Sequence, residues 1–86
     1  MSKTIWKYSI TPDCTLDIPM GAKFLDVQTQ HGSPVAWFLV NPNQITTKRV
    51  FKTYGTGHPV PENPGKFLGS FQLESGALVF HLFEDV

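Results

Sequence analysis

The segment 53–59, Thr-Tyr-Gly-Thr-Gly-His-Pro, combines residue types that suit the binding of a small molecule. Its two glycines, two positions apart, let the backbone approach a ligand and turn N–H groups toward an anion. Tyr54 offers a ring on which a base can stack, and His58 offers a hydrogen bond. Three cations just upstream can neutralise phosphate groups. The predicted ligand-binding residues are Lys48, Arg49, Lys52, Tyr54, Gly55, Thr56, Gly57 and His58.

A purely structural interpretation of the same glycines stays open. No Gly-Lys-Ser or Gly-Lys-Thr follows the segment, so it lacks the motif of a phosphate-binding loop. The loop 55–65 contains three prolines and three glycines, and glycine there can serve an awkward turn.

The remaining nucleophiles and metal-ligand residues form no recognisable motif. His31, His58 and His81 are scattered without ligand spacing, which predicts no structural zinc. Neither a histidine nor a basic cluster adjoins Cys14, which is expected to be buried as a small hydrophobic residue. The carboxylates include no spaced pair suited to acid–base work. We therefore expect a protein that is not an enzyme and that uses neither a metal nor a cofactor.

The charge balance and the apolar pattern exclude several classes of partner. Seven Lys plus Arg residues match seven Asp plus Glu residues, which argues against binding to duplex nucleic acid or to an acidic membrane surface. No apolar run approaches the roughly 20 residues of a membrane span. The start of the chain lacks an apolar signal core, so we expect a cytoplasmic protein.

Strand-forming residues alternate with turns along the whole chain, and helical periodicity is almost absent. Seven prolines and seven glycines interrupt runs rich in β-branched and aromatic residues. This pattern predicts one all-β domain over residues 1–86, a small antiparallel β-sandwich or barrel of six to seven strands. The predicted strands cover residues 4–10, 15–18, 22–30, 35–40, 46–54, 66–73 and 77–83.

The distribution of apolar residues predicts which strands are central and which side chains are buried. Runs 35–40 and 77–83 are apolar on both faces, which is typical of central strands. In run 22–30, Leu25 is expected to share one face with Val27, and in run 66–73, Phe67 is expected to face inward with Phe71. We expect the rings to form the core rather than a base-stacking platform. They are Trp6, Tyr8, Trp37, Phe51, Phe67, Phe71, Phe80 and Phe83.

His81 lies inside the apolar run 77–83 and alternates onto the face of Val79 and Phe83. A hydrogen-bonded histidine of the core or of an interface is the expected role.

A chain this short has a small core, and a single cysteine excludes an internal disulfide. Self-association can offset the low stability that a small core provides, so we expect a homo-oligomer, most simply a dimer.

Five segments of the chain occur together in one known family. They are Thr-Ile-Trp-Lys-Tyr at 4–8, Ile-Pro-Met-Gly-Ala-Lys at 18–23, the strand around Trp37, Tyr-Gly-Thr-Gly-His-Pro at 54–59 and Gly-Ala-Leu-Val-Phe-His at 76–81. The chain resembles a family of short proteins encoded by bacteriophages and prophages, built on a domain of unknown function. The resemblance implies a small accessory phage protein that acts in the cytoplasm of the infected bacterium, and it supplies no catalytic residues.

Two functions follow as expectations. The first is a phage protein that counteracts bacterial immunity by binding and sequestering a nucleotide-type signal, a small phosphate-bearing ligand. The alternative is a protein-interaction module that inhibits a host defence protein directly, for which an exposed patch or edge strand suffices.

Overall fold

Alternating polar and apolar residues between closely spaced turns fold residues 2–86 into seven strands, and this part of the chain contains no α-helix. The structure, a computed structural model, describes residues 2–86. One short 3-10 turn, η1, separates the last two strands. The elements are β1 (Thr4–Ser9), β2 (Asp13–Pro19), β3 (Lys23–Gln30), β4 (Ser33–Val40), β5 (Thr46–Gly55), β6 (Lys66–Leu73), η1 (Glu74–Gly76) and β7 (Leu78–Asp85).

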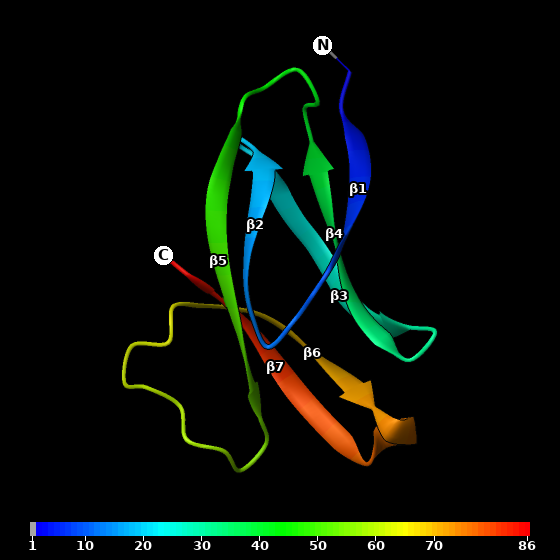
Figure 1. Cartoon of the computed structure of the whole chain (residues 1–86), viewed down its shortest axis with the longest axis vertical. Coiled ribbons are helices and arrows are strands. Elements are labelled where there is room, and N and C mark those ends of the chain that lie inside the picture. The colour runs from blue at the N-terminus through cyan, green and yellow to red at the C-terminus, as the bar shows by residue number, and fades with distance from the viewer. Residues whose placement is uncertain (1) are drawn as a thin grey trace.

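The strands form two antiparallel sheets that pack as a small sandwich. The order is β1-β4-β3 in the three-stranded sheet and β2-β5-β7-β6 in the four-stranded sheet. In Figure 1 the four-stranded sheet runs from β5 and β2 on the left to β6 at the lower right. The predicted sandwich is confirmed, and so are the central positions of β4 and β7. Here the inner face of each sheet is the one toward the other sheet, and the outer face is the opposite one.

Four strands are longer than the sequence pattern predicts. β4 spans Ser33–Val40 rather than 35–40, and β5 spans Thr46–Gly55 rather than 46–54. β2 spans Asp13–Pro19 rather than 15–18, and β7 spans Leu78–Asp85 rather than 77–83. Pro19 is tolerated because it is the last residue of an edge strand, where its missing N–H breaks no ladder. β7 continues through Glu84, a residue that is only 6% exposed and whose carboxylate has a cation partner inside the sandwich.

Phe38, at the middle of β4, is the centre of the core. Its ring meets Tyr8 and Phe24 of its own sheet and Phe51 of the facing sheet edge to face, with centroid distances of 5.6, 5.6 and 5.8 Å. Edge-to-face contacts place the positive rim of one ring on the negative face of the next. The buried core cluster comprises Ile10, Ile18, Ala22, Val27, Ala36, Phe38, Val40, Phe51, Phe71 and Leu82.

Two β-bulges overturn the predicted burial of two apolar side chains. The β3–β4 register shifts between Phe24 and Asp26, and Leu25 is 46% exposed whereas Val27 is buried. The β6–β7 register shifts between Phe67 and Gly69, which leaves Phe67 54% exposed. A bulge inserts one unpaired residue and reverses the alternation beyond it. The predictions that Leu25 is buried with Val27 and that Phe67 faces inward are therefore wrong.

Trp6 also departs from the expected core. It is 40% exposed because it lies on β1, an edge strand that pairs only with β4 among the described residues.

The opposite side of the sandwich is closed by a contact between β3 and β6, where the Thr29 hydroxyl donates a hydrogen bond to the Gln72 carbonyl oxygen.

Candidate functional site

The loop after β5 begins with a tight turn that requires its glycines. The His58 N–H donates to the Gly55 carbonyl oxygen at 3.0 Å, and Gly57 has φ +85°. These are the hydrogen bond and the positive φ of a type II turn. A Cβ at Gly55 would lie 2.6 Å from His58 Nδ1, so the imidazole packs directly on the bare backbone of Gly55. Local structure thus accounts for both glycines, whether or not a ligand binds.

The same turn forms one wall of a cleft of about 300 Å³ on the outer face of the four-stranded sheet. The long loop to β6 leaves the sheet at this point, at the lower left of Figure 1. Five residues of the predicted site meet here, from Tyr54 to His58. The lining residues are Tyr54, Gly55, Thr56, Gly57, His58, Val60, Phe67, His81 and Phe83.

Three aromatic rings form the floor of the cleft. Phe83 lies between the other two, with centroid distances of 5.6 Å to Tyr54 and 5.4 Å to Phe67. The strand register explains this row, because Phe83 is opposite Phe67 across β6 and β7, and Tyr54 is opposite the nearby His81. Phe67 is the most exposed of the three rings. It offers a flat apolar surface to a ligand.

Beside the rings, two hydroxyl groups hold the imidazole of His81. Ser70 Oγ lies 2.7 Å from His81 Nδ1, and Thr56 Oγ1 lies 2.8 Å from His81 Nε2. The Thr56 hydroxyl is also 3.4 Å from the Val79 carbonyl oxygen, which accepts its hydrogen. We therefore assign Nε2–H as the donor to Thr56 and Nδ1 as the acceptor from Ser70. The imidazole plane is fixed from both sides.

The predicted cations do not gather in this cleft. Arg49 lies on the inner face of β5, where Nε and Nη2 donate to the Glu84 carboxylate at 2.6 and 2.8 Å. Its Nη1 donates to the Ala22 carbonyl oxygen at 2.7 Å, and the guanidinium carbon is 5.4 Å from the Phe38 centroid. Hydrogen bonding to Glu84 raises the pKa of Arg49, partly offset by burial, so the guanidinium stays charged.

The two lysines of the predicted site lie on the outer face with different neighbours. Lys48 forms an exposed ion pair with Asp17 at 3.1 Å. Lys52 is directly opposite Phe83 in the register and makes no ion pair among residues 2–86. Lys52 therefore flanks the aromatic floor, whereas Lys48 is already neutralised.

A second, more polar hollow adjoins the cleft through Phe67. It has a volume of about 440 Å³ and lies where β3 and β6 begin and β7 ends. Its wall contains Lys23, Lys66 and the Arg49–Glu84 pair. Neither lysine has an ion-pair partner in the described part of the chain. Phe67 lines both hollows, so a ligand stacked on this ring also lies beside cations.

Sequence reasoning missed the contributions of Phe67, Ser70 and His81 to the cleft. His81 was expected in the core or an interface, and it is hydrogen-bonded but on the outer face of β7. The pairing of β5 with β7 and of β6 with β7 places Tyr54, His81 and Ser70 in one row. This arrangement of the three residues can be recognised only when the strand order and the registers of the β5–β7 and β6–β7 pairs are known.

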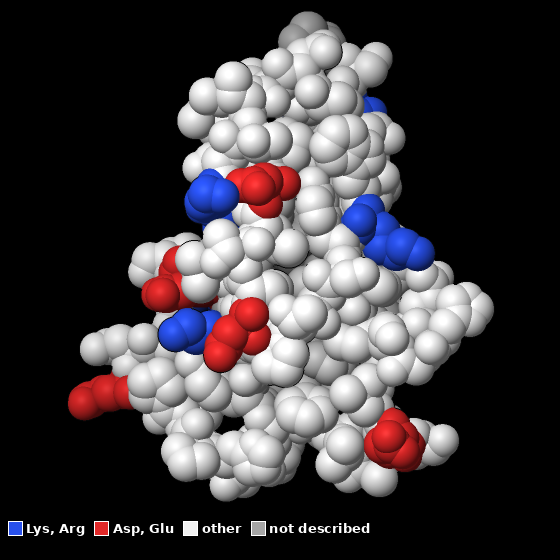
Figure 2. Space-filling view, viewed as in Figure 1, with Lys and Arg blue, Asp and Glu red and all other residues white. Residues whose placement is uncertain are grey.

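The described chain has no metal-binding cluster and no membrane-spanning helix. No group of three or more His, Cys, Asp or Glu among residues 2–86 is placed to hold a metal ion. Within the same residues no helix has the length and hydropathy to cross a membrane. Figure 2 shows small, separated groups of acidic and basic side chains on the face it presents, with no broad basic patch there.

Comparison with known protein families identifies the family of this chain. The model described as Domain of unknown function (DUF7352) matches residues 1–86, so the chain belongs to the DUF7352 family. No curated protein and no solved structure matches the chain.

Proposed function

We propose that this DUF7352 protein is a binding module for a small molecule that carries a flat heteroaromatic ring and a phosphate group, as a nucleotide does. The observation that carries the proposal is the exposed ring of Phe67. It is a large apolar surface in the wall of a cleft that also holds fixed polar groups. Clefts with apolar walls and a few oriented polar groups are the usual form of small-molecule sites.

Stacking on Phe67 supplies the main attraction in this proposal. A base stacked on an aromatic side chain is stabilised by about 1–3 kcal/mol. In the hydrogen-bonded Ser70–His81–Thr56 group beside it, the side chains are already ordered. The two hydroxyl oxygens can therefore accept a hydrogen bond from the polar edge of a ring without loss of side-chain entropy.

The phosphate group is assigned to lysines rather than to Arg49. Lys66 is adjacent to Phe67 in β6, and Lys52 is opposite Phe83 in β7. Both lack carboxylate partners among residues 2–86. Arg49 is already held by Glu84 on the inner face, which makes it a structural residue and leaves the earlier prediction for it without geometric support.

The biological role we propose is sequestration of a nucleotide signal of bacterial immunity by a phage accessory protein in the host cytoplasm. Its support is the resemblance of the chain to proteins encoded by bacteriophages and prophages. Sequestration requires tight binding without chemical change of the ligand. The ligand should therefore be recovered intact after the protein is denatured.

Isothermal titration against a panel of linear and cyclic nucleotides tests the proposal. At least one nucleotide should bind, and Phe67→Ala should weaken its binding by about 5- to 150-fold, since the stacking contribution is about 1–3 kcal/mol. Trp6→Ala is the matched control, because it removes another exposed ring from the other sheet and should leave the affinity unchanged. Absence of binding by every nucleotide in the panel contradicts the proposal.

A second candidate function, inhibition of a host protein by direct contact, is favoured by the β1 edge. Ile5 is 56% exposed on this strand, next to the exposed ring of Trp6. Exposed edge strands bind other chains by adding a strand to the sheet. In this case Ile5→Lys should abolish capture of the host protein, whereas Phe67→Ala should not.

A further inference from the structure

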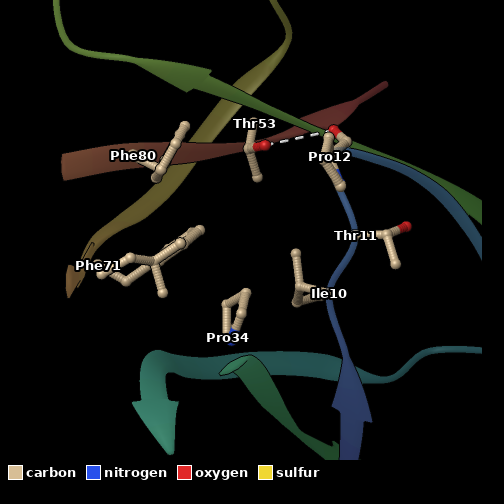
Figure 3. Close-up of a pocket in the computed structure, with 8 residues that line it drawn as sticks. Ile10, Thr11, Pro12, Pro34, Thr53, Phe71 and Phe80 are labelled. Carbon is tan, nitrogen blue, oxygen red and sulfur yellow. Dashed lines mark hydrogen bonds between the residues drawn. The ribbon is translucent and has the colours of Figure 1, made fainter. Parts of the chain in front are cut away.

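We propose a second binding site, a cavity between the two sheets that takes a small uncharged apolar molecule with about the bulk of a methyl-substituted benzene ring. The cavity has a volume of about 200 Å³ and opens at the end of the sandwich where the β1–β2 linker crosses from one sheet to the other. Figure 3 shows Ile10, Pro34, Phe71 and Phe80 around its centre. The proposal does not depend on the function of the outer cleft.

The side chains in the wall of this cavity offer a ligand no charge and no free hydrogen-bond donor. No charged side chain lines it. Its two hydroxyl groups are already used, since Thr53 donates to the Pro12 carbonyl oxygen at 3.3 Å and Thr11 to the Asp13 carbonyl oxygen at 3.2 Å. Figure 3 shows the first of these bonds at the rim, directed away from the centre. A charged ligand, or one that needs a hydrogen-bond donor, would lose its hydration without compensation, which favours an apolar occupant.

The cavity is held open by the linker that forms one of its walls. The Ile10 N–H donates to the Pro34 carbonyl oxygen at 3.1 Å in the three-stranded sheet. Two residues later, the Pro12 carbonyl oxygen accepts the Thr53 N–H at 2.9 Å in the four-stranded sheet. The linker is thus tied to both sheets, and the rings of Pro12 and Pro34 restrict its backbone. These ties oppose a collapse that would fill the space, so the site exists before a ligand arrives.

The shape of the cavity favours a ring. Phe71 and Phe80 stack with a centroid distance of 5.8 Å and an interplanar angle of 25°, which gives one side of the cavity a broad aromatic wall. An enclosed apolar cavity of about 150 Å³ lined by Leu, Ile and Phe stays dry and holds benzene or xenon. The larger volume here leaves room for one additional carbon or two.

The two sites lie on opposite faces of one strand. Phe80 faces the cavity between the sheets, and the next residue, His81, faces the outer cleft. A ligand in one site therefore does not occupy the other. Toluene is a suitable ligand for the test because it has no polar group, and the signals of His81 report any toluene that stacks on Phe67 in the outer cleft instead.

The test is a toluene titration of the folded chain followed by NMR. We expect saturable shifts of the methyl signals of Ile10 and Leu73, with little change at His81. Thr53→Ile and Leu73→Phe add bulk to the wall and should weaken toluene binding by roughly tenfold. The controls Thr15→Ile and Leu25→Phe make the same changes at exposed positions outside the cavity and should bind toluene as the wild type does.

Two results would overturn the proposal. One is a wild-type spectrum in which the lining signals do not shift up to the solubility limit of toluene. The other is undiminished toluene binding in both enlarged variants while both remain folded. Tight binding of toluene together with absent nucleotide binding would support this cavity and refute only the function proposed for the cleft.

Discussion

The guanidinium group of Arg49 and the carboxylate of Glu84 form a two-point ion pair inside the sandwich, with Nε–Oε2 and Nη2–Oε1 distances of 2.6 and 2.8 Å. The side chains are only 21% and 8% exposed. The guanidinium also lies over the rings of Phe38 and Phe51. The pair thus closes the end of the core where an apolar side chain would otherwise be expected.

Removal of one partner of this pair should be costly. Glu84→Ala leaves the Arg49 charge unpaired in a largely buried position, and the free energy of unfolding should fall by about 3 kcal/mol. Urea denaturation measured by tryptophan fluorescence gives the value. The exposed pair provides the control, because Asp17→Ala should change stability by less than about 1 kcal/mol. Equal effects of the two substitutions would show that the inner pair contributes no more than a surface contact.

The two phenylalanines of β6 should differ sharply in their effect on stability. Phe71 is 6% exposed in the core, and Phe71→Ala should lower the free energy of unfolding by about 3–4 kcal/mol. Phe67→Ala removes a half-exposed ring and should cost less than about 1 kcal/mol. Thermal and urea unfolding of both variants measure the difference. A large loss in Phe67→Ala would mean that the ring is part of the core in solution.

This contrast also marks the limit of what the sequence predicts. Strand composition and the two-sided apolar runs predicted a sandwich or barrel of six to seven strands and the central positions of β4 and β7, which agree with the seven-stranded sandwich observed. The burial of Phe67 was mispredicted because a bulge depends on the pairing of β6 with β7. Arg49 and Glu84 are 35 positions apart, so no local pattern reveals that one neutralises the other. The sequence predicted the turn of the cleft, because residues 55–58 are consecutive. It did not predict the hydrogen bonds of His81, because they depend on how β7 pairs with β5 and β6.

Gly57→Ala should disturb the cleft through the backbone. Gly57 has φ +85° and open space around it, so alanine meets only the strain of the left-handed region, roughly 1–2 kcal/mol. Gly32→Ala is the matched control, with φ +81° and equally open surroundings in the β3–β4 turn. Both should lose similar stability, but only Gly57→Ala should shift the NMR signals of Thr56 and His81. Unchanged signals there would indicate that the turn does not define the cleft.

Alkaline pH should destabilise the fold through Tyr8. Burial raises the pKa of Tyr8 above its ordinary value of 10.0, so the unfolded chain releases this proton at a lower pH than the folded chain. The free energy of unfolding should therefore fall as the pH rises above about 10. Tyr8→Phe keeps the edge-to-face contact with Phe38 and should reduce this fall. Identical alkaline unfolding curves for both proteins would exclude Tyr8 as the cause.

The final prediction concerns the β1 edge and self-association. β1 pairs with β4 alone among the described strands, and it exposes Ile5 and Trp6. An apolar edge strand is a template for a second copy of the chain, so the protein should form a dimer at micromolar concentration. Light scattering should then return about twice the monomer mass of 9.6 kDa. Ile5→Lys places a charge on this edge and should restore the monomer mass without loss of secondary structure, whereas Lys3→Ala, just before β1, should leave the dimer intact. A mass of 9.6 kDa for the wild type at every concentration would exclude the dimer.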